Sequence, residues 1–354
     1  MHRSGTEGST DVTQQQGQQH SQQQVTSRGT AVIWFNQPAP DAPPDSLDLL
    51  EQVRTVGEAL RKLGFTPQEL PFSLDFEALR TSLRALNPTV VVNLVESVEE
   101  DGRLCHLAPA MLEFLGVKFT GCPSYAMYVT TNKLLAKRLF LAHGVDTAPW
   151  LSLHDSHAFE DGAAYVIKAV GEDASIGIGE DSVVSGLSRA QLVAELARRS
   201  KKLGREQFAE RYIDGREFNI AVVGTNDEPT LMPVAELLFP EVWKDKTYKV
   251  FGYASKWDET HEAYVSERRY DFEEKDAHTL SEIRRITELC WRQLRFKGYA
   301  RADFRVDTSG RPWLLEFNAN PGIAPDSGFV AAVQRAGQRF EDVIGRIVEL
   351  ARLA

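Results

Sequence analysis

The stretch from Gly298 to Gly322 constrains the fold of this chain more than any other segment. It predicts two strands joined by a turn at residues 307–310, with Val306 opposite Arg311. Because successive side chains of a strand point to opposite sides, this pairing gives the segment two faces. The polar face carries Arg301, Asp303, Arg305, Glu316 and Asn318. The apolar face carries Phe304, Val306, Trp313, Leu315 and Phe317, and it predicts a core.

The polar face of this hairpin predicts a metal–nucleotide site. It brings the carboxylates of Asp303 and Glu316 and the amide of Asn318 close to an arginine. Hard divalent cations take oxygen ligands, and Mg²⁺ held by one or two carboxylates usually also holds substrate phosphates. We therefore predict Asp303, Glu316 and Asn318 as metal ligands.

Composition narrows the class of protein. A hydrophobic content of 42% and a charged content of 25% are ordinary for a soluble globular chain. A net charge of -10 argues against a nucleic-acid partner, and no apolar run is long enough to span a bilayer. Three cysteines without metal-like spacing fit a reducing, cytoplasmic location.

The chain begins with a segment unlike the rest. Residues 1–28 are rich in glutamine, serine and threonine, and they hold almost no apolar side chains. Such a segment cannot bury enough surface to offset the entropy lost on ordering, so it predicts a disordered tail.

The pattern that follows predicts a parallel α/β layer, because strands and helices alternate. The strands are expected at 31–35 and 89–94, and the helices at 47–63 and 107–115. Further along, helices are expected at 133–142, 187–203 and from 340 onward, with strands at 164–170, 207–213 and 217–223. Residues 240–264 have no clear period and predict a long mobile loop.

Lys168 is the first candidate for binding an anion. It lies on an apolar strand, where a lysine without a partner is costly. The alternative is an internal ion pair with a nearby glutamate. The loop at 172–179 comes just after this strand, and its two glycines, backbone N–H groups and Ser175 hydroxyl fit a phosphate cradle. A loop with two glycines is more often a simple turn, and this one is not a Walker A sequence.

Two further segments suit a nucleotide, although each is weak evidence alone. Lys133 opens a helix, where a basic side chain opposes the helix dipole, yet an isolated lysine there is usually a solvated surface residue. The strand end formed by Glu210, Arg211, Tyr212 and Ile213 offers backbone groups for an adenine. Glu217, seven residues after Glu210, offers a carboxylate for ribose hydroxyls.

The order of these segments resembles ATP-grasp ligases, and among them D-alanine–D-alanine ligases and their relatives. The resemblance spans roughly residues 30–354, and the paired Arg-x-Asp and Glu-x-Asn motifs followed by Pro-Gly are its most specific part. The matching motifs are Asn93–Leu94, Phe119–Gly121, Asn132–Lys133, Val166–Lys168, Ser175–Gly177, Arg301–Asp303, Leu315–Asn318 and Pro321–Gly322.

The resemblance implies an α/β fold of the ATP-grasp type with three parts. These are an N-terminal parallel α/β domain (29–121), a central α+β domain (122–208) and a C-terminal α+β domain with the metal site (209–354). ATP would lie between the last two.

The resemblance also implies a role for each candidate residue. Lys133 and Lys168 would contact the α- and β-phosphates, and Ser175 would lie on the loop side. The segment from Glu210 to Ile213 would hold adenine, and Glu217 the ribose. Two Mg²⁺ ions, or Mn²⁺, would be held by Asp303, Glu316 and Asn318.

The implied reaction is ATP-dependent amide formation through an acyl phosphate. A carboxylate would attack the γ-phosphate, and an amine would then displace phosphate. Lys168, Arg301 and the backbone of Gly322 would stabilise the transferring group and the oxyanion.

Ser327 and Gly328 begin a predicted helix, and a helix N-terminus with a serine suits a carboxylate. In the resembled ligases this place holds the carboxylate of the acceptor amino acid. On the sequence alone, the alternative that Ser327 only caps the helix has equal weight.

Three departures from the family pattern concern the donor. Ala174 replaces a serine, Lys256–Trp257 replaces a Lys-Tyr pair, and Glu96–Ser97 replaces a His-Gly pair. Lost hydroxyls and a large aromatic surface predict a donor other than D-alanine, such as a larger or flatter natural-product precursor. Glu96 or Glu99 would face a cationic or hydroxylated donor, unless both are solvated loop charges.

Three hypotheses follow from the sequence. The first is a ligase of altered donor specificity that uses small carboxylic acids and amino acids. The second is a genuine D-alanine–D-alanine ligase of cell-wall synthesis, and the third is a catalytically silent ATP-binding regulator. A homodimer is one candidate for the assembly of the protein.

Overall fold

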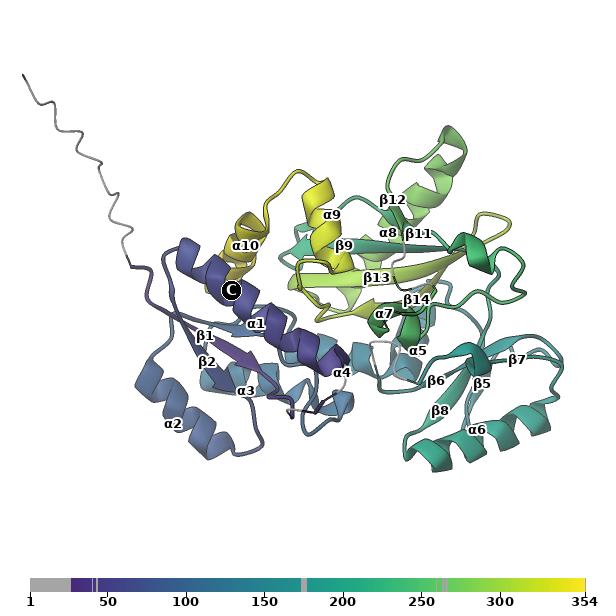
Figure 1. The fold of residues 1–354 in the computed structure, drawn as a ribbon, viewed down its shortest axis with the longest axis horizontal. Coiled ribbons are helices and arrows are strands. Elements are labelled where there is room, and N and C mark those ends of the chain that lie inside the picture. The colour runs from purple at the N-terminus through teal and green to yellow at the C-terminus, as the bar shows by residue number, and fades with distance from the viewer. Residues whose placement is uncertain are drawn as a thin grey trace, which may run out of the picture.

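The computed structural model describes residues 27–39, 41–42, 44–172, 177–258, 260–262, 264 and 267–353. Nearly all of the predicted tail, together with Ala174 and Ser175 of the predicted phosphate loop, lies outside the described residues. Three sheets organise the chain: a small N-terminal sheet, a central sheet and a larger C-terminal sheet that lies above them in Figure 1. Among the described helices, none is long and apolar enough to cross a membrane.

The N-terminal sheet is parallel, as the alternating pattern predicts. Its strand order is β2 (Thr66–Pro71), β1 (Thr30–Phe35), β3 (Val90–Asn93). Its helices are α1 (Pro44–Lys62), α2 (Phe76–Leu86) and α3 (Leu107–Leu115). Alternation along β1 sends Ile33 toward α1 and Trp34 toward α2 and α3, so both faces are covered. Neither β2 nor α2 is among the elements predicted from the sequence. Strand β2 is mostly exposed and polar and gives little signal. Helix α2 is amphipathic, with Leu79 and Leu83 buried and Asp75 as its cap, so its pattern was overlooked.

The central sheet is antiparallel and packs against two helices, α6 (Arg189–Leu203) through Leu192 and Leu196 and α5 (Lys133–Ala142) through Leu134. Its strands are β5 (Ser156–His157), β4 (Trp150–Leu151), β8 (Gln207–Arg211), β6 (Tyr165–Ala169) and β7 (Val183–Val184), in that order. Helix α6 (Arg189–Leu203) begins with a capping box at Ser188 and packs Leu192 and Leu196 against Tyr165 and Ala209. The expected division at residues 208/209 falls inside β8, which pairs only within this sheet.

The C-terminal sheet contains the predicted hairpin of residues 298–322. The strand order is β12 (Arg268–Arg269), β11 (Ala235–Leu237), β9 (Gly215–Gly224), β13 (Gly298–Asp307) and β14 (Pro312–Asn318), and β10 (Pro229–Leu231) also pairs with β9. One face packs against α4 (Ser124–Thr131), α5 (Lys133–Ala142) and α8 (Ala277–Gln293). Helices α9 (Gly328–Arg335) and α10 (Phe340–Leu353) cover one end of the other face. The rest of that second face is available to a site.

Residues 240–264 contain more structure than the expected loop. The short helix α7 (Tyr253–Trp257) lies in this segment, and Trp243 and Phe251 form a small aromatic core with Leu237 and Phe239. The chain also has 3₁₀ turns, namely η1 (Gly102–Leu104), η2 (Glu180–Ser182), η3 (Glu241–Trp243) and η4 (Glu274–Asp276).

The hairpin pairing corrects one part of the sequence prediction. Val306 lies opposite Pro312, not Arg311, and a β-bulge shifts the register between Asp303 and Phe304. The extra residue is on β14, so Leu314 takes the core position expected for Leu315 and Trp313. Beyond the bulge the expected polar pairs are present, with Asp303 opposite Glu316 and Arg301 opposite Asn318.

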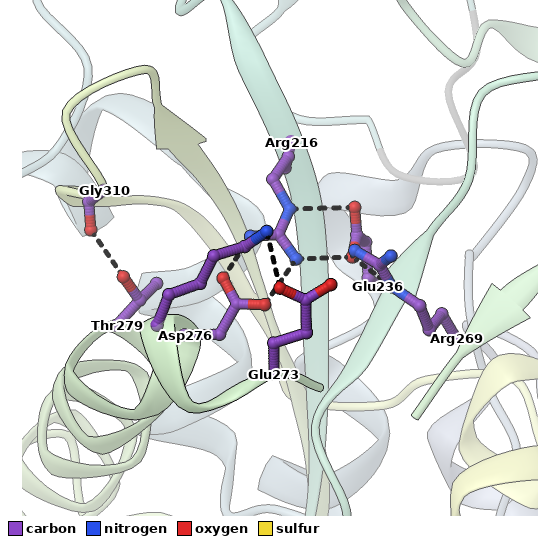
Figure 2. Close-up of polar contacts among 8 residues, drawn as sticks. Arg216, Glu236, Arg269, Glu273, Asp276, Thr279 and Gly310 are labelled. Atoms are coloured by element: carbon purple, nitrogen blue, oxygen red, sulfur yellow. Dashed lines mark hydrogen bonds and ion pairs between the residues drawn. The ribbon is translucent and has the colours of Figure 1, made fainter. Parts of the chain in front are cut away.

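An ion network ties the edge of this sheet to the start of α8 (Figure 2). Arg216 Nη2 lies 2.7 Å from Glu236 Oε2, and Arg216 Nη1 lies 2.5 Å from Asp276 Oδ1. Arg269 Nε donates to the same Glu236 oxygen at 3.0 Å. Glu236 is only 5% exposed and contacts two guanidinium groups, those of Arg216 and Arg269.

We expect Glu236→Gln to lower the free energy of unfolding by about 1–3 kcal/mol, because two guanidinium groups lose their charged acceptor. Urea unfolding followed by circular dichroism measures this change. Glu282→Gln is the matched control, since Glu282 pairs with Arg285 on the exposed side of α8 and its loss is expected to change stability by less than about 1 kcal/mol. Equal losses in both variants would contradict a structural role for the network.

Candidate functional site

Two adjoining cavities lie against the polar face of the C-terminal sheet. The larger has a volume of about 440 Å³ and is lined by residues of α1, the β3–η1 loop, the C-terminal sheet and the start of α9. The smaller, of about 90 Å³, lies between the central and C-terminal sheets. Both share a wall formed by Glu217, Phe251, Lys256, Asp303 and Glu316. A ligand in one cavity therefore lies next to a ligand in the other.

The smaller cavity collects the side chains predicted to bind a nucleotide, and we call it the nucleotide cleft. Apart from Ser175, which is not among the described residues, all the predicted cofactor-binding residues line it. They are Lys133, Lys168, Glu210, Arg211, Tyr212, Ile213 and Glu217. They come from α5, β6, the end of β8 and β9, so the tertiary fold unites segments that are far apart in the sequence.

Lys133 is a buried residue of this cleft and not a solvated surface lysine. Asn132 caps α5 by accepting from the Leu135 N–H group, and the Lys133 N–H group donates to the Val170 carbonyl at 2.9 Å. Its side chain is 7% exposed, and Nζ lies 3.0 Å from Glu316 Oε2. Burial alone would raise the pKa of Glu316, but the Lys133 and Lys168 ammonium groups outweigh burial and lower it.

Lys168 pairs with an internal glutamate, which is the alternative that its strand position left open. Its ammonium contacts Glu210 on the neighbouring strand β8. The other oxygen of Glu210 lies 2.5 Å from Nζ of Lys137, a fully buried lysine of α5. Burial raises the pKa of Glu210, but the two lysines lower it further, so the carboxylate stays charged. The cluster is thus two cations around one buried anion.

Sequence reasoning did not find Lys137. It lies one helical turn after Lys133, among apolar residues of α5, and this spacing was the available signal. Its ammonium also donates to Thr147 Oγ1 at 2.7 Å, and Thr147 donates to the carbonyl of Leu314 at 2.6 Å. Lys137 therefore links the lysine–glutamate cluster to the hairpin strand that carries Glu316.

The predicted metal ligands lie on facing strands. Asp303 and Glu316 are cross-strand partners, and Asp303 accepts two hydrogen bonds of 2.8 Å from Arg301. Among the described residues, no group of three or more histidine, cysteine or acidic side chains lies close enough to hold a metal. The predicted donor set has two carboxylates and the amide of Asn318, which are oxygen ligands of the kind that a hard divalent cation takes.

Glu217 faces both cavities from β9. Arg305, directly opposite on β13, lies 3.4 Å from its carboxylate and is itself held by the carbonyl of Gly215 at 3.2 Å. Burial raises the pKa of Glu217, and Arg305 opposes that shift. A carboxylate fixed in this way at the junction of the cavities can accept hydrogen bonds from hydroxyl groups.

The larger cavity, which we call the substrate cavity, is lined by every residue predicted to bind substrate. These are Glu96, Lys256, Trp257, Ser327 and Gly328, together with the predicted catalytic residues Arg301 and Gly322. Glu99, the alternative to Glu96, is not among the lining residues. The structure thus brings together five segments. Their order along the chain follows from the sequence, but their contacts do not.

Sequence reasoning also missed residues of α1 in this cavity. Gln52 donates to Asp48 Oδ2 at 3.1 Å and to Glu96 Oε1 at 3.2 Å, and it accepts from the Ile323 N–H group at 2.9 Å. Asp48 and Gln52 are one turn apart, which gave only a common helix face as a signal. Gln52 therefore joins the N-terminal domain to the loop that follows Gly322.

The fold and this arrangement of two lysines, facing carboxylates and adjoining cavities define an ATP-grasp enzyme. The chain belongs to the D-alanine–D-alanine ligase family, because the model of the D-ala D-ala ligase C-terminus matches residues 154–349, more than half of the chain. It is therefore an ATP-dependent ligase that forms C–N bonds between a carboxylate and an amine, with a divalent metal and small-molecule substrates.

Individual relatives agree with this family. The chain is 28% identical to the uncharacterized protein y4sG of Sinorhizobium fredii over 264 residues, 74% of each chain. It is 29% identical to a D-alanine–D-alanine ligase of Cupriavidus necator over 259 residues, 72% of each chain.

Solved structures share the fold. A D-alanyl-alanine synthetase A from Vibrio cholerae has a TM-score of 0.70 at 17% identity, covering 92% of this chain and 99% of its own. A D-alanine–D-alanine ligase from Bacillus anthracis complexed with ATP has a TM-score of 0.68 at 16% identity, covering 91% and 97%.

We expect Glu210→Gln to lower the free energy of unfolding by about 3–5 kcal/mol, because Lys137 is left buried without its anion. The folded-state pKa of Glu210 lies below its ordinary value of 4.5. Its contribution is therefore present above that value and is lost as the pH falls through the folded-state pKa. Urea unfolding at neutral and at acid pH should show a difference between variant and wild type that shrinks in acid.

The control for this prediction is Glu160→Gln. Glu160 also pairs with an arginine, Arg211, but its side chain is 59% exposed. Its replacement should change stability by less than about 1 kcal/mol at either pH. A Glu210 variant as stable as this control would show that the buried cluster does not hold the domain together.

Proposed function

We propose that this enzyme joins a carboxylic acid other than D-alanine to an amino acid, in natural-product biosynthesis. The observation that carries the proposal is the composition of the substrate cavity, whose lining includes Trp257, Asp48 and Glu96. A volume of about 440 Å³ is within the range of cavities that hold drug-sized ligands. A donor with an apolar body and a cationic or hydroxylated end suits this lining.

In the proposed reaction a donor carboxylate oxygen attacks the γ-phosphorus of ATP, the bond to the bridging oxygen breaks, and ADP leaves. The amine nitrogen of the acceptor then attacks the acyl carbon of the acyl phosphate. Inorganic phosphate leaves with the electrons of the C–O bond, and the amine gives up a proton. Most of the catalysis in such phosphoryl transfer comes from positioning and charge stabilisation.

We assign roles to the residues according to their position. Lys133 and Lys168 lie where they can bind ATP phosphates, the Glu210–Ile213 segment and Glu217 line the nucleoside end, and Ser175 belongs to the proposed phosphate loop. Arg301 and the Gly322 backbone line the substrate cavity, where a transferring phosphoryl group and an oxyanion need stabilisation.

The ion pairs of the site support this assignment. Lys133 pairs with Glu316, and Arg301 pairs with Asp303, so cations and anions neutralise each other within the protein. Phosphates can take over the cations, and a divalent metal can take over the carboxylates. We propose that Asp303, Glu316 and Asn318 hold two Mg²⁺ ions, with Mn²⁺ as a substitute, to neutralise charge that develops on the phosphoryl group.

The acceptor is proposed to be an amino acid whose carboxylate binds at Ser327 and Gly328. Ser327 caps α9 by accepting from the Val330 N–H group at 3.2 Å, so its capping role is present as well. The two functions are compatible, because the remaining N–H groups of the first turn stay available to a carboxylate.

Two other functions are the alternatives, a D-alanine–D-alanine ligase and a catalytically silent ATP-binding regulator. A genuine D-alanine–D-alanine ligase is favoured by the relatives that carry this activity in their names. A silent regulator is opposed by the full set of charged groups in the nucleotide cleft. We also propose a cytoplasmic location, which agrees with three buried free cysteines. We propose a homodimer as the assembly, and light scattering tests it.

We expect ADP release only when a suitable carboxylic acid and an amino acid are present together. A matrix of acids and amino acids, with ADP release as the rate and mass spectrometry of the product, tests this expectation. Turnover with D-alanine alone would instead identify the cell-wall ligase. Tight ATP binding without turnover on any pair would identify the regulator.

We expect Glu316→Gln to lower the rate of ADP release by about 100-fold or more and to raise the Mg²⁺ concentration needed for half-maximal activity. The reason is that the site loses one of its two carboxylates. Titration of Mg²⁺ in the ADP assay measures both effects. Asp227→Asn, in an exposed turn between β9 and β10, is the control and should behave like wild type. An unchanged Mg²⁺ dependence in the Glu316 variant would place the metal elsewhere.

A further inference from the structure

Two neighbouring arginines of β12 lie on opposite faces of the C-terminal sheet. Arg268 is opposite Leu237 and Arg269 is opposite Glu236 on β11, so the alternation of the strand separates their side chains. Arg269 joins the ion network on the face that packs against α8 (Figure 2). Arg268 lines the substrate cavity together with Leu237 and Glu217. Of the two arginines of β12, Arg269 therefore belongs to the ion network and Arg268 to the substrate cavity.

Arg268 lacks an anionic partner within the described residues. No carboxylate forms a salt bridge with it, and its buried Nε has no hydrogen-bond acceptor. A buried donor without an acceptor costs about 1–3 kcal/mol, and more when the group is charged. Arg216 and Arg269, by contrast, are both paired with Glu236. The free guanidinium is therefore a group that an anionic ligand can satisfy.

The guanidinium lies at the start of α9. A Cβ atom placed on Gly328 would be 3.4 Å from Arg268 Nη2, which shows how close the two groups are. Val330 donates to Ser327 Oγ, and Ala331 donates to the Ser327 carbonyl at 2.9 Å. In the described part of the chain, the Gly328 and Phe329 N–H groups have no acceptor. Arg268 and these two N–H groups therefore converge on one corner of the cavity.

The other groups near Arg268 act on its charge in opposite senses. Arg301 is close enough to act on it electrostatically, and Asp326 and Tyr270 act in the opposite sense. Burial, with a contribution from Arg301, lowers the pKa of Arg268 from its ordinary value. The guanidinium stays protonated, because an arginine is effectively never deprotonated in a protein. An anion that binds here would compensate for the desolvation of the Arg268 guanidinium and for its repulsion from Arg301.

The position of Arg268 favours an anion of a substrate over the nucleotide. Arg268 lines the substrate cavity and does not line the nucleotide cleft, where Lys133 and Lys168 lie. A planar guanidinium with parallel N–H donors matches a carboxylate better than a spherical ion.

We propose that Arg268 is a specificity-determining residue that binds the carboxylate of the acceptor amine together with the first turn of α9. The enzyme then selects acceptors with a free carboxylate over amines and amides of the same shape. This inference rests on the proposed ligase function and adds to it the residue that enforces the acceptor class.

The test compares Arg268→Met and Arg268→Lys with wild type and with Arg269→Met as the matched control. ADP release is measured at saturating ATP, Mg²⁺ and donor, with the best amino acid of the matrix and its carboxamide as alternative acceptors. For the free acid, Arg268→Met should raise KM by about 10- to 100-fold with little change in kcat. For the carboxamide it should change KM little, and Arg268→Lys should recover part of the affinity.

A binding measurement keeps the test independent of turnover. D-Alanine and D-alaninamide are titrated calorimetrically into the enzyme with Mg²⁺ and a non-hydrolysable ATP analogue. The wild type and Arg269→Met should prefer the acid, and Arg268→Met should lose that preference. If no acid–amine pair gives ADP, the proposed ligase function fails, while the calorimetric preference still decides the role of Arg268. An acid preference retained in Arg268→Met, or lost equally in Arg269→Met, would overturn the proposal.

Discussion

The whole site depends on the two-sided character of the C-terminal sheet. Side chains of β9, β13 and β14 alternate between a packed face and a polar face. Phe218, Phe304 and Phe317 are buried on the first face against α4, α5 and α8. Because this packing holds the strands in register, Glu217, Asp303 and the rest of the polar face keep fixed positions. The alternation therefore connects the stability of the domain to the geometry of the site.

Charge compensation is the second organising constraint. Lys133 and Lys168 line the nucleotide cleft, and Lys137 is buried in α5 beside Glu210. Each of the three lysines is matched by Glu210 or Glu316 on a neighbouring strand. Buried charges are tolerated only when paired, so these contacts let the empty site fold with its charges in place. Ligands that bring phosphates and a divalent cation can then exchange partners with the pairs. Arg268 differs because its partner is missing from the described protein, and that difference points to the substrate.

Much of this organisation follows from local sequence patterns. The hairpin motif, the caps at Asn132 and Ser188, and the apolar strands around Val91 and Ile167 each depend on neighbours within a few residues. Short-range steric and hydrogen-bonding rules decide such features, so one sequence suffices to predict them. The same rules miss β2, since a polar edge strand carries little periodic signal. Helix α2 does carry the apolar period of an amphipathic helix, with Leu79 and Leu83 buried, and the sequence interpretation overlooked it.

By itself, the sequence determined which faces of the strands are polar, and the order of the lysines, acids and glycine turns. Only the tertiary structure decided which groups meet. The bulge that replaces Leu315 by Leu314 in the core, the buried Lys137 beside Glu210, and the opposite fates of Arg268 and Arg269 all depend on pairing between distant segments. Such pairing is set by packing and by electrostatics across the folded chain, and neither acts between neighbours in the sequence.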